Sequence, residues 1–181
     1  MARMPERTIS SRRAFTGRLL AMRVDEVELA SGRRAVREVV EHPGAVAVLA
    51  WDGDRLAMVS QWRQAAGADL LEIPAGTCEP GEVPLVTAQR ELAEECGLHA
   101  ARWQEGPSFY TAPGFSTELL TLYLAMQLGP IDTTAPDDEA LERSWLALPS
   151  ALSAIDAGRI RDAKSLVGIL WLARRLPHVE S

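Results

Sequence analysis

The sequence predicts an α+β protein in which strands surround one central helix and two further helices close the chain. Two kinds of segment lead to this class. Apolar, β-rich runs recur between turns that contain Gly, Asp or Pro. Helices are indicated at 84–96, 149–159 and 162–176, the first by Pro84 at its start and Gly97 just beyond its end.

The N-terminal region is predicted to be a polar start followed by three strands. Residues 1–12 are polar and are expected to be loose. The stretch 15–42 has the pattern of three strands, with a turn at 31–33 (Ser-Gly-Arg) between the last two. Strands joined in this way are expected to form an antiparallel sheet.

The middle of the chain is predicted to supply the strands of the core. The run 44–51 is small, apolar and β-rich, as a strand buried on both faces would be. Asp52-Gly53-Asp54 then indicates a hairpin turn to a returning strand at 55–63. The remaining predicted segments are short strands at 69–76, 102–111 and 118–128, and an acidic loop at 132–142.

The composition restricts the class of protein. The chain has 181 residues, of which 47% are hydrophobic and 24% charged, with a net charge of −6, so one main domain with a sizeable core is expected. An acidic chain lacks the broad positive field of a nucleic-acid or membrane-surface binder. Two cysteines form no disulfide framework and fit a reducing cytoplasm. We expect no signal peptide and no membrane-spanning segment.

Three glutamates dominate the predicted central helix. Glu91, Glu94 and Glu95 stand at i, i+3 and i+4, which places their carboxylates on one face. The preceding loop adds Glu82, and Arg90 is expected to pair with Glu94 at i+4, leaving the other carboxylates for a cation. Oxygen ligands without His or Cys suit Mg²⁺ or Mn²⁺, which would in turn hold phosphates. The alternative is a solvated acidic face, but the loop and helix boundaries favour a cation site.

These residues resemble the Nudix motif, in which G, five residues, E and seven residues precede R-E-aliphatic-x-E-E-x-G-aliphatic. The sequence fills every position of it: Gly76, Glu82, Arg90, Glu91, Leu92, Glu94, Glu95, Gly97 and Leu98. The resemblance implies the Nudix fold, a mixed β-sheet between α-helices. It also implies metal-dependent hydrolysis of a nucleoside diphosphate linked to another group.

Further segments resemble the ADP-ribose pyrophosphatase branch of the Nudix superfamily. They are "LEIPAG" before the motif and "YTAPGFSTE" after it, where Pro113 lies sixteen residues past Gly97. The resemblance implies an N-terminal β extension over 1–41 and a Nudix domain over 42–181. It also implies homodimers in which N-terminal strands are exchanged, the alternative being an ordinary edge sheet on a monomer.

The resemblance assigns roles to residues of the motif. Glu91 and Glu95 would hold the cations, with Glu94 contributing. The carbonyl of Ala75 would be a further ligand and Glu82 a supporting one.

The same resemblance extends to substrate contacts and to the general base. The base would come from the acidic loop, with Glu139 as first choice and Glu142 as second, and Arg90 completes the catalytic set. Arg63 would contact the phosphates, although a surface arginine is the competing interpretation. The other candidate substrate contacts are Glu118 at the terminal ribose, Trp62 at the adenine, where packing is the alternative, and Pro113.

The implied reaction is attack of water on ADP-ribose to give AMP and ribose 5-phosphate, with Mg²⁺ as cofactor and Mn²⁺ as a substitute. Alternative substrates are another nucleoside diphosphate sugar, NADH or an oxidised nucleotide. A catalytically silent ADP-ribose sensor is the second class, which the complete motif disfavours. The expected partner is a small molecule, with no nucleic acid and no membrane.

Overall fold

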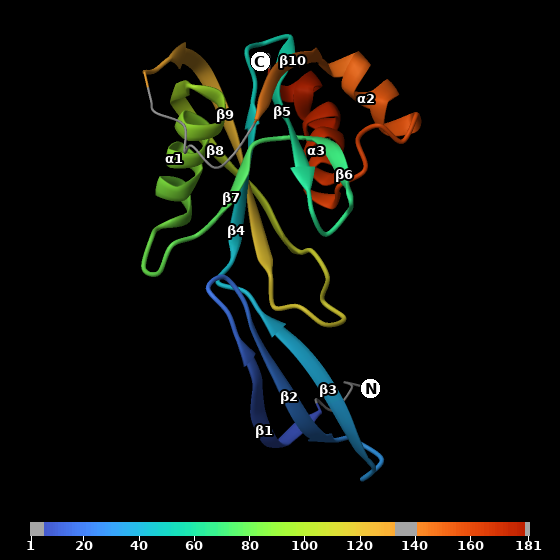
Figure 1. The fold of residues 1–181 in the computed structure, drawn as a ribbon. Coiled ribbons are helices and arrows are strands. Elements are labelled where there is room, and N and C mark those ends of the chain that lie inside the picture. The colour runs from blue at the N-terminus through green and yellow to red at the C-terminus, as the bar shows by residue number, and fades with distance from the viewer. Residues whose placement is uncertain (1–5, 133–140, 180–181) are drawn as a thin grey trace. The chain divides into compact units, whose positions relative to one another are not determined.

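The computed structural model describes residues 6–132 and 141–179 and confirms the α+β class. Strands precede and follow the central helix, and the helices lie within a few residues of their predicted positions (Figure 1). The elements are β1 Arg7–Thr16, β2 Ala21–Glu28, β3 Arg34–Glu41, β4 Ala45–Ala50, β5 Arg55–Arg63, β6 Ala68–Glu72, β7 Ala75–Thr77, α1 Pro84–Cys96, β8 Leu98–Tyr110, β9 Leu119–Pro130, β10 Glu142–Ala147, α2 Leu148–Asp156 and α3 Ala163–Val179.

Contacts divide the chain into two compact units. The N-terminal unit combines Met1–Gly44 with Tyr110–Leu119, and the second unit combines Ala45–Phe109 with Leu120–Ser181. The segment that follows β8 therefore joins the N-terminal strands, which the sequence pattern did not indicate. The backbone explains the association, because Val40 N–H donates to Phe115 and Thr117 N–H donates to Val40.

The N-terminal unit contains the antiparallel sheet β1-β2-β3. The three strands and the turn before β3 are confirmed, but residues 7–12, which were expected to be loose, belong to β1. Their pairing with β2 explains the difference, since Arg7 lies opposite Glu28 and forms an ion pair with it. All ten residues of β1 are exposed, so neither face of the strand is buried.

The second unit is built on the mixed sheet β7-β4-β9-β8, in which β4 is parallel to β9 and antiparallel to β7. Successive residues of β4 face opposite sides, and both sides are buried, as predicted. Helix α1 covers one face, and α2 and α3 cover the other (Figure 1). The α1 face contains Val46, Val48, Ala88 and Leu92, and the opposite face contains Leu49, Leu122, Ile169 and Leu172.

A second sheet, β10-β5-β6, lies in the same unit. The Asp52-Gly53-Asp54 turn forms, since Asp52 Oδ1 accepts hydrogen bonds from two following backbone N–H groups and Gly53 has a φ of 110°. The predicted hairpin is nevertheless wrong in its pairing. Only the bridge between Trp51 and Leu56 joins the two strands, and β5 pairs with β6 and β10 instead.

Helix α1 begins at Pro84 and ends at Cys96, as the sequence predicted. Gly97 follows with a φ of 64°, and its N–H donates to the carbonyl of Ala93 at 2.8 Å. Arg143 of β10 satisfies two more carbonyls of the last turn. Its Nε donates to Glu95 O at 2.6 Å and its Nη2 to Glu94 O at 3.0 Å. The turn that carries two motif glutamates is therefore fixed by a side chain from the other sheet.

None of the helices in the described segments has the length and apolar character needed to cross a bilayer.

Candidate active site

The motif carboxylates lie where α1 packs against β7. Glu95 is 4% exposed, and its Oε2 accepts a hydrogen bond from the N–H of Ala75 at 2.9 Å. The carboxylate of Glu91 lies against Gly76, so closely that a Cβ at that position would overlap it. The glycine of the motif is therefore required by the close approach of a carboxylate to the β7 backbone.

Arg90 gathers three of the motif carboxylates around one guanidinium. Its Nη1 donates to Glu91 at 2.7 Å and to Glu94 at 3.1 Å. Its Nε and Nη2 donate to Glu82, each at 3.2 Å. The predicted pair with Glu94 is confirmed, but the expectation that Arg90 would leave the other carboxylates clear is wrong. The planar guanidinium has five donors and can serve several carboxylates at once.

Glu82 is fixed in the loop before α1 by further donors. Its Oε2 accepts from Thr87 Oγ1 at 2.8 Å and from the N–H of Glu79 at 3.1 Å. The hydrogen bond from Arg90, supported by those two donors, outweighs partial desolvation and lowers the pKa of Glu82 to about 2. The pKa of Arg90 is raised by the same carboxylates. Glu82 in the loop and Arg90 in the helix therefore both stay ionised and form an ion pair.

The donor set fits a hard divalent cation, because every candidate ligand is an oxygen atom. In the described residues, no three His, Cys, Asp or Glu side chains are already arranged as a metal site. Instead, the positive charge among the carboxylates is that of Arg90. Arg90 contacts one oxygen of Glu91 and one oxygen of Glu94, so a cation and the guanidinium can share these two carboxylates. Glu82 already accepts four hydrogen bonds and is the least suited to bind a cation as well.

Arg63, at the end of β5, is held by a buried carboxylate. Its Nη2 donates to Glu72 at 2.6 Å, and its Nε lies 3.1 Å from the same oxygen. Lys164 Nζ donates to that oxygen as well, at 2.7 Å. Trp62 is 56% exposed and its Nε1 donates to Gln64, so packing in the core of this chain does not explain it.

Pro113 and Glu118 belong to the N-terminal unit. Pro113 lines a cavity of about 670 Å³ there, together with Arg37 and Phe115. Glu118 accepts a hydrogen bond from Thr111 Oγ1, and its Oε1 lies 3.8 Å from His42 Nε2. Their part in a substrate site stays a prediction.

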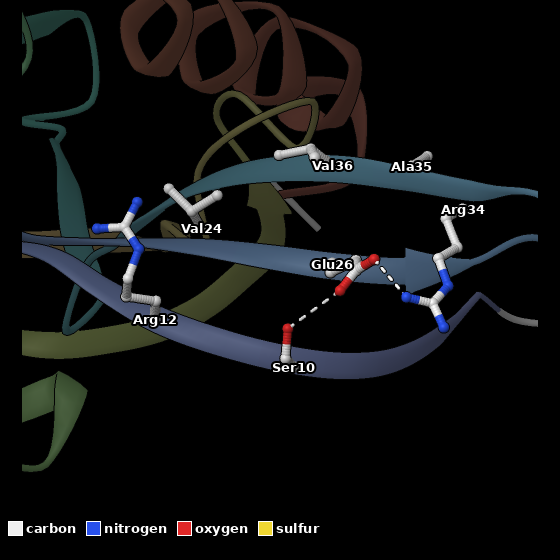
Figure 2. Close-up of a pocket in the computed structure, with 7 residues that line it drawn as sticks. All are labelled: Ser10, Arg12, Val24, Glu26, Arg34, Ala35 and Val36. Carbon is white, nitrogen blue, oxygen red and sulfur yellow. Dashed lines mark hydrogen bonds and ion pairs between the residues drawn. The ribbon is translucent and has the colours of Figure 1, made fainter.

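Another pocket, of about 440 Å³, lies on the N-terminal sheet (Figure 2). Glu26 stands at its centre and accepts hydrogen bonds from Arg34 at 3.0 Å and from Ser10 at 3.5 Å. Arg12 and Val24 line the same pocket in Figure 2. No motif residue takes part in it.

The two candidates for the general base are Glu139 and Glu142. Glu139 lies outside the described residues. Glu142 is the first residue of β10, is exposed, and pairs with Ser60 of β5.

Sequence reasoning missed Glu72, Lys164 and Arg143. Glu72 had a usable signal, since an acidic residue inside the apolar run "LLEIPA" must have a cation as its partner if it is buried. Lys164 had another, as the single lysine of the sequence. Arg143 had none, because its two carbonyl partners lie almost fifty positions earlier in the chain.

Two family models match adjacent segments of the chain. A model described as the NUDIX domain matches residues 41–166. The chain belongs to the Nudix hydrolase family. A second model, described as the nucleoside diphosphate sugar hydrolase N-terminal domain, matches residues 6–40, so the strands that precede the Nudix domain also have relatives.

Individual proteins resemble this Nudix hydrolase over nearly its whole length. The methanol dehydrogenase activator of Bacillus methanolicus is 41% identical over 92% of each chain. The ADP-ribose pyrophosphatase of Bacillus subtilis is 38% identical over 95% of each chain. That of Mycobacterium tuberculosis is 39% identical over 94% of this chain and 84% of its own. A solved structure described as an ADP compounds hydrolase has a TM-score of 0.87 at 19% identity, covers 98% of this chain and 97% of its own, and confirms the fold.

Gly76→Ala tests the close contact between the Glu91 carboxylate and the β7 backbone. The new Cβ would displace the Glu91 carboxylate from β7, so Mn²⁺ affinity, measured by electron paramagnetic resonance, should fall by about 10–100-fold. Gly114→Ala is the matched control, because a Cβ there meets no atom within 4 Å. Equal Mn²⁺ affinities in both variants would exclude Glu91 as a ligand.

Glu82→Gln tests the charge held by Arg90. Glu82 has an ordinary pKa of 4.5 and a folded pKa of about 2, so its ionised form stabilises the fold fully above pH 4.5. The variant should lose about 1 kcal/mol of unfolding free energy at neutral pH. This loss should disappear as the pH falls from 4.5 towards 2 in chemical denaturation experiments. A constant difference over that range would mean that Arg90 does not favour the ionised carboxylate.

Proposed function

We propose that this Nudix hydrolase cleaves ADP-ribose to AMP and ribose 5-phosphate with the help of a divalent cation. The observation that carries the proposal is the identity of 38–39% with two proteins named ADP-ribose pyrophosphatase, over almost the whole chain. The complete motif and its clustered carboxylates support the same activity. The substrate class also agrees with the N-terminal family match.

The cation in this proposal is Mg²⁺, with Mn²⁺ as a substitute. Its ligands would be Glu91, Glu94, Glu95 and the carbonyl of Ala75, with Glu82 in support. When bound, the metal would neutralise phosphate charge and favour an ionised water. Support comes from the oxygen-only donor set and from the buried Glu95, whose carboxylate is oriented by the Ala75 N–H.

The chain's own residues would supply positioning and proton transfer. Arg90 holds the three carboxylates on one side of the motif and limits their mutual repulsion. A glutamate of the acidic segment would accept the proton of the attacking water, with Glu139 as first choice and Glu142 as second. The water oxygen bonds to one phosphorus while the bridging P–O bond breaks, so each product carries one phosphate.

The residues proposed for substrate binding have separate roles. Arg63 would pair with phosphate oxygens, for which a guanidinium has suitable geometry. The exposed Trp62 would stack on the adenine. Glu118 would bind the terminal ribose, and Pro113 is a further candidate substrate contact.

We also propose that residues 1–41 serve dimerisation, beside a Nudix domain over 42–181. The support is the exposure of all ten residues of β1, together with apolar side chains such as Phe15 (58% exposed) and Val36 (61% exposed). An open edge and exposed apolar groups favour pairing with a second copy. A cytoplasmic location is proposed from the two cysteines, which are both free thiols in the structure.

Two other functions compete with this proposal. A relative with 41% identity is named a methanol dehydrogenase activator, so activation of a dehydrogenase is the second candidate. A silent ADP-ribose sensor is the third. Adding the protein to a methanol dehydrogenase, with and without an intact Glu95, separates activation from hydrolysis.

The proposed activity is tested by incubating the protein with ADP-ribose and Mg²⁺, with and without excess EDTA. AMP and ribose 5-phosphate should form only without EDTA, because the carboxylates alone would repel the diphosphate. Glu95→Gln should abolish turnover through loss of metal, whereas Glu139→Gln should slow chemistry with little change in affinity for substrate. If Glu142→Gln slows chemistry instead, the base assignment moves to Glu142. Intact ADP-ribose under both conditions would refute the activity and direct the assay to other nucleoside diphosphates.

The proposed dimer is tested by sedimentation equilibrium. The wild type should show twice the chain mass of 19.7 kDa. Phe15→Asp should shift it towards the monomer, because a charge would have to be buried at the interface. Val86→Asp, the same kind of change at an exposed apolar residue of α1 outside residues 1–41, is the control and should remain dimeric. A monomeric wild type at micromolar concentration would refute the dimer.

A further inference from the structure

Four charged side chains form one ion-pair network between β5, β6 and the start of α3. Glu72 accepts from Arg63 Nη2 at 2.6 Å and from Lys164 Nζ at 2.7 Å. Lys164 Nζ also donates to Asp162 at 3.0 Å. Two cations therefore stand against two carboxylates, and the formal charge of the network is zero.

The centre of this network is buried. The exposed fraction is 2% for the side chain of Glu72, 13% for Lys164 and 38% for Arg63. An ionised carboxylate is expensive to bury unless cations and hydrogen bonds compensate for lost water. Glu72 therefore depends on both cations, and Arg63 is the member of the network that a ligand reaches most easily.

Lys164 occupies an unusual position for a cation. It lies in the first turn of α3, where the positive end of the helix dipole disfavours it. It is also the single lysine among 19 basic residues. Its ammonium is a compact charge with three donors, and it reaches Glu72 and Asp162 together. Its two carboxylate partners explain the position better than the stability of the helix does.

Arg63 connects this network to the Nudix motif. Glu72 lies three residues before Ala75, whose N–H binds Glu95. Among the described residues, the hydrogen bonds of Arg63 run from Nε and Nη2, which leaves its Nη1 edge for a ligand. Burial lowers the pKa of Arg63, but the Glu72 hydrogen bond and the nearby carboxylate charges outweigh it, so its pKa is raised. The guanidinium stays charged.

We propose that Lys164 is a positioning residue that keeps Arg63 competent to bind the substrate's diphosphate, by sharing the charge of Glu72. Without Lys164, Arg63 alone faces Glu72 and Asp162, and the network carries a net charge of −1. Its attraction for an anionic ligand would then fall. This inference rests on the proposed function, because it takes the ligand to be a nucleoside diphosphate derivative.

The test measures binding separately from turnover, by calorimetry with the α,β-methylene analogue of ADP-ribose, whose P–C–P bridge resists hydrolysis. Lys164→Met should weaken binding about tenfold, because the network beside the ligand changes from neutral to a net charge of −1. The double variant Glu72→Gln/Lys164→Met is neutral again and should bind within about threefold of the wild type. A purely structural role for Lys164 predicts the opposite order, since a second buried substitution would add damage.

Two controls sharpen the result. Arg161→Met removes the same formal charge from an exposed residue near α3 and should bind the analogue within about twofold of the wild type. In ADP-ribose hydrolysis, Lys164→Met should raise KM and leave kcat nearly unchanged, as expected for lost binding. Unchanged binding in Lys164→Met, equal weakening in Arg161→Met, or further weakening in the double variant would each overturn the proposal.

Failure of the proposed function gives a different pattern. A wild type that binds the analogue and shows the charge rescue, but leaves ADP-ribose intact, would support the network and refute the hydrolysis. A wild type that hydrolyses ADP-ribose while Lys164→Met binds normally would refute the network alone. A wild type that does not bind the analogue would refute the network, and ADP-ribose left intact by the same preparation would refute the hydrolysis as well.

Discussion

The guanidinium of Arg90 is the interaction on which the arrangement of the Nudix motif depends. It binds one carboxylate from the loop, Glu82, and two from the helix, Glu91 and Glu94. Without it, these like charges would repel one another across one helical turn and the loop would lose its fixed partner. The same contacts keep the Glu82 carboxylate ionised and hold the loop against α1. The geometry of the carboxylates and the stability of the loop therefore have one cause.

The strand β7 and the residues before it are fixed from two directions. On the motif side, Glu95 accepts the N–H of Ala75 at 2.9 Å. On the side of α3, the buried Ser165 accepts the N–H of Ile73 at 2.9 Å through its hydroxyl. Between them, Glu72 holds Arg63 at the end of β5. The backbone from Ile73 to Ala75 is therefore held by side chains from both helical layers.

Much of the fold followed from local patterns. Helix α1 begins and ends where Pro84 and Gly97 indicated, and β5 has the predicted bounds. The errors arose where partners are distant in sequence. The polar residues 7–12 predict a loose segment by themselves. They form a strand because β2 pairs with them across the sheet. The Asp52-Gly53-Asp54 turn predicted a hairpin, but β5 gains more partners from β6 and β10 than from β4.

By itself, the sequence determined the family, the position of the motif helix, the face that carries Glu91, Glu94 and Glu95, and the pair between Arg90 and Glu94. These features depend on spacing within a few turns of one segment, and helical geometry converts spacing into position. Tertiary structure alone decided that Arg90 also holds Glu82 and Glu91, that Arg143 caps α1, and that Lys164 shares Glu72 with Arg63. Such contacts join residues whose separation along the chain carries no information about their distance in space. Burial then makes them specific, because a buried charge requires a partner.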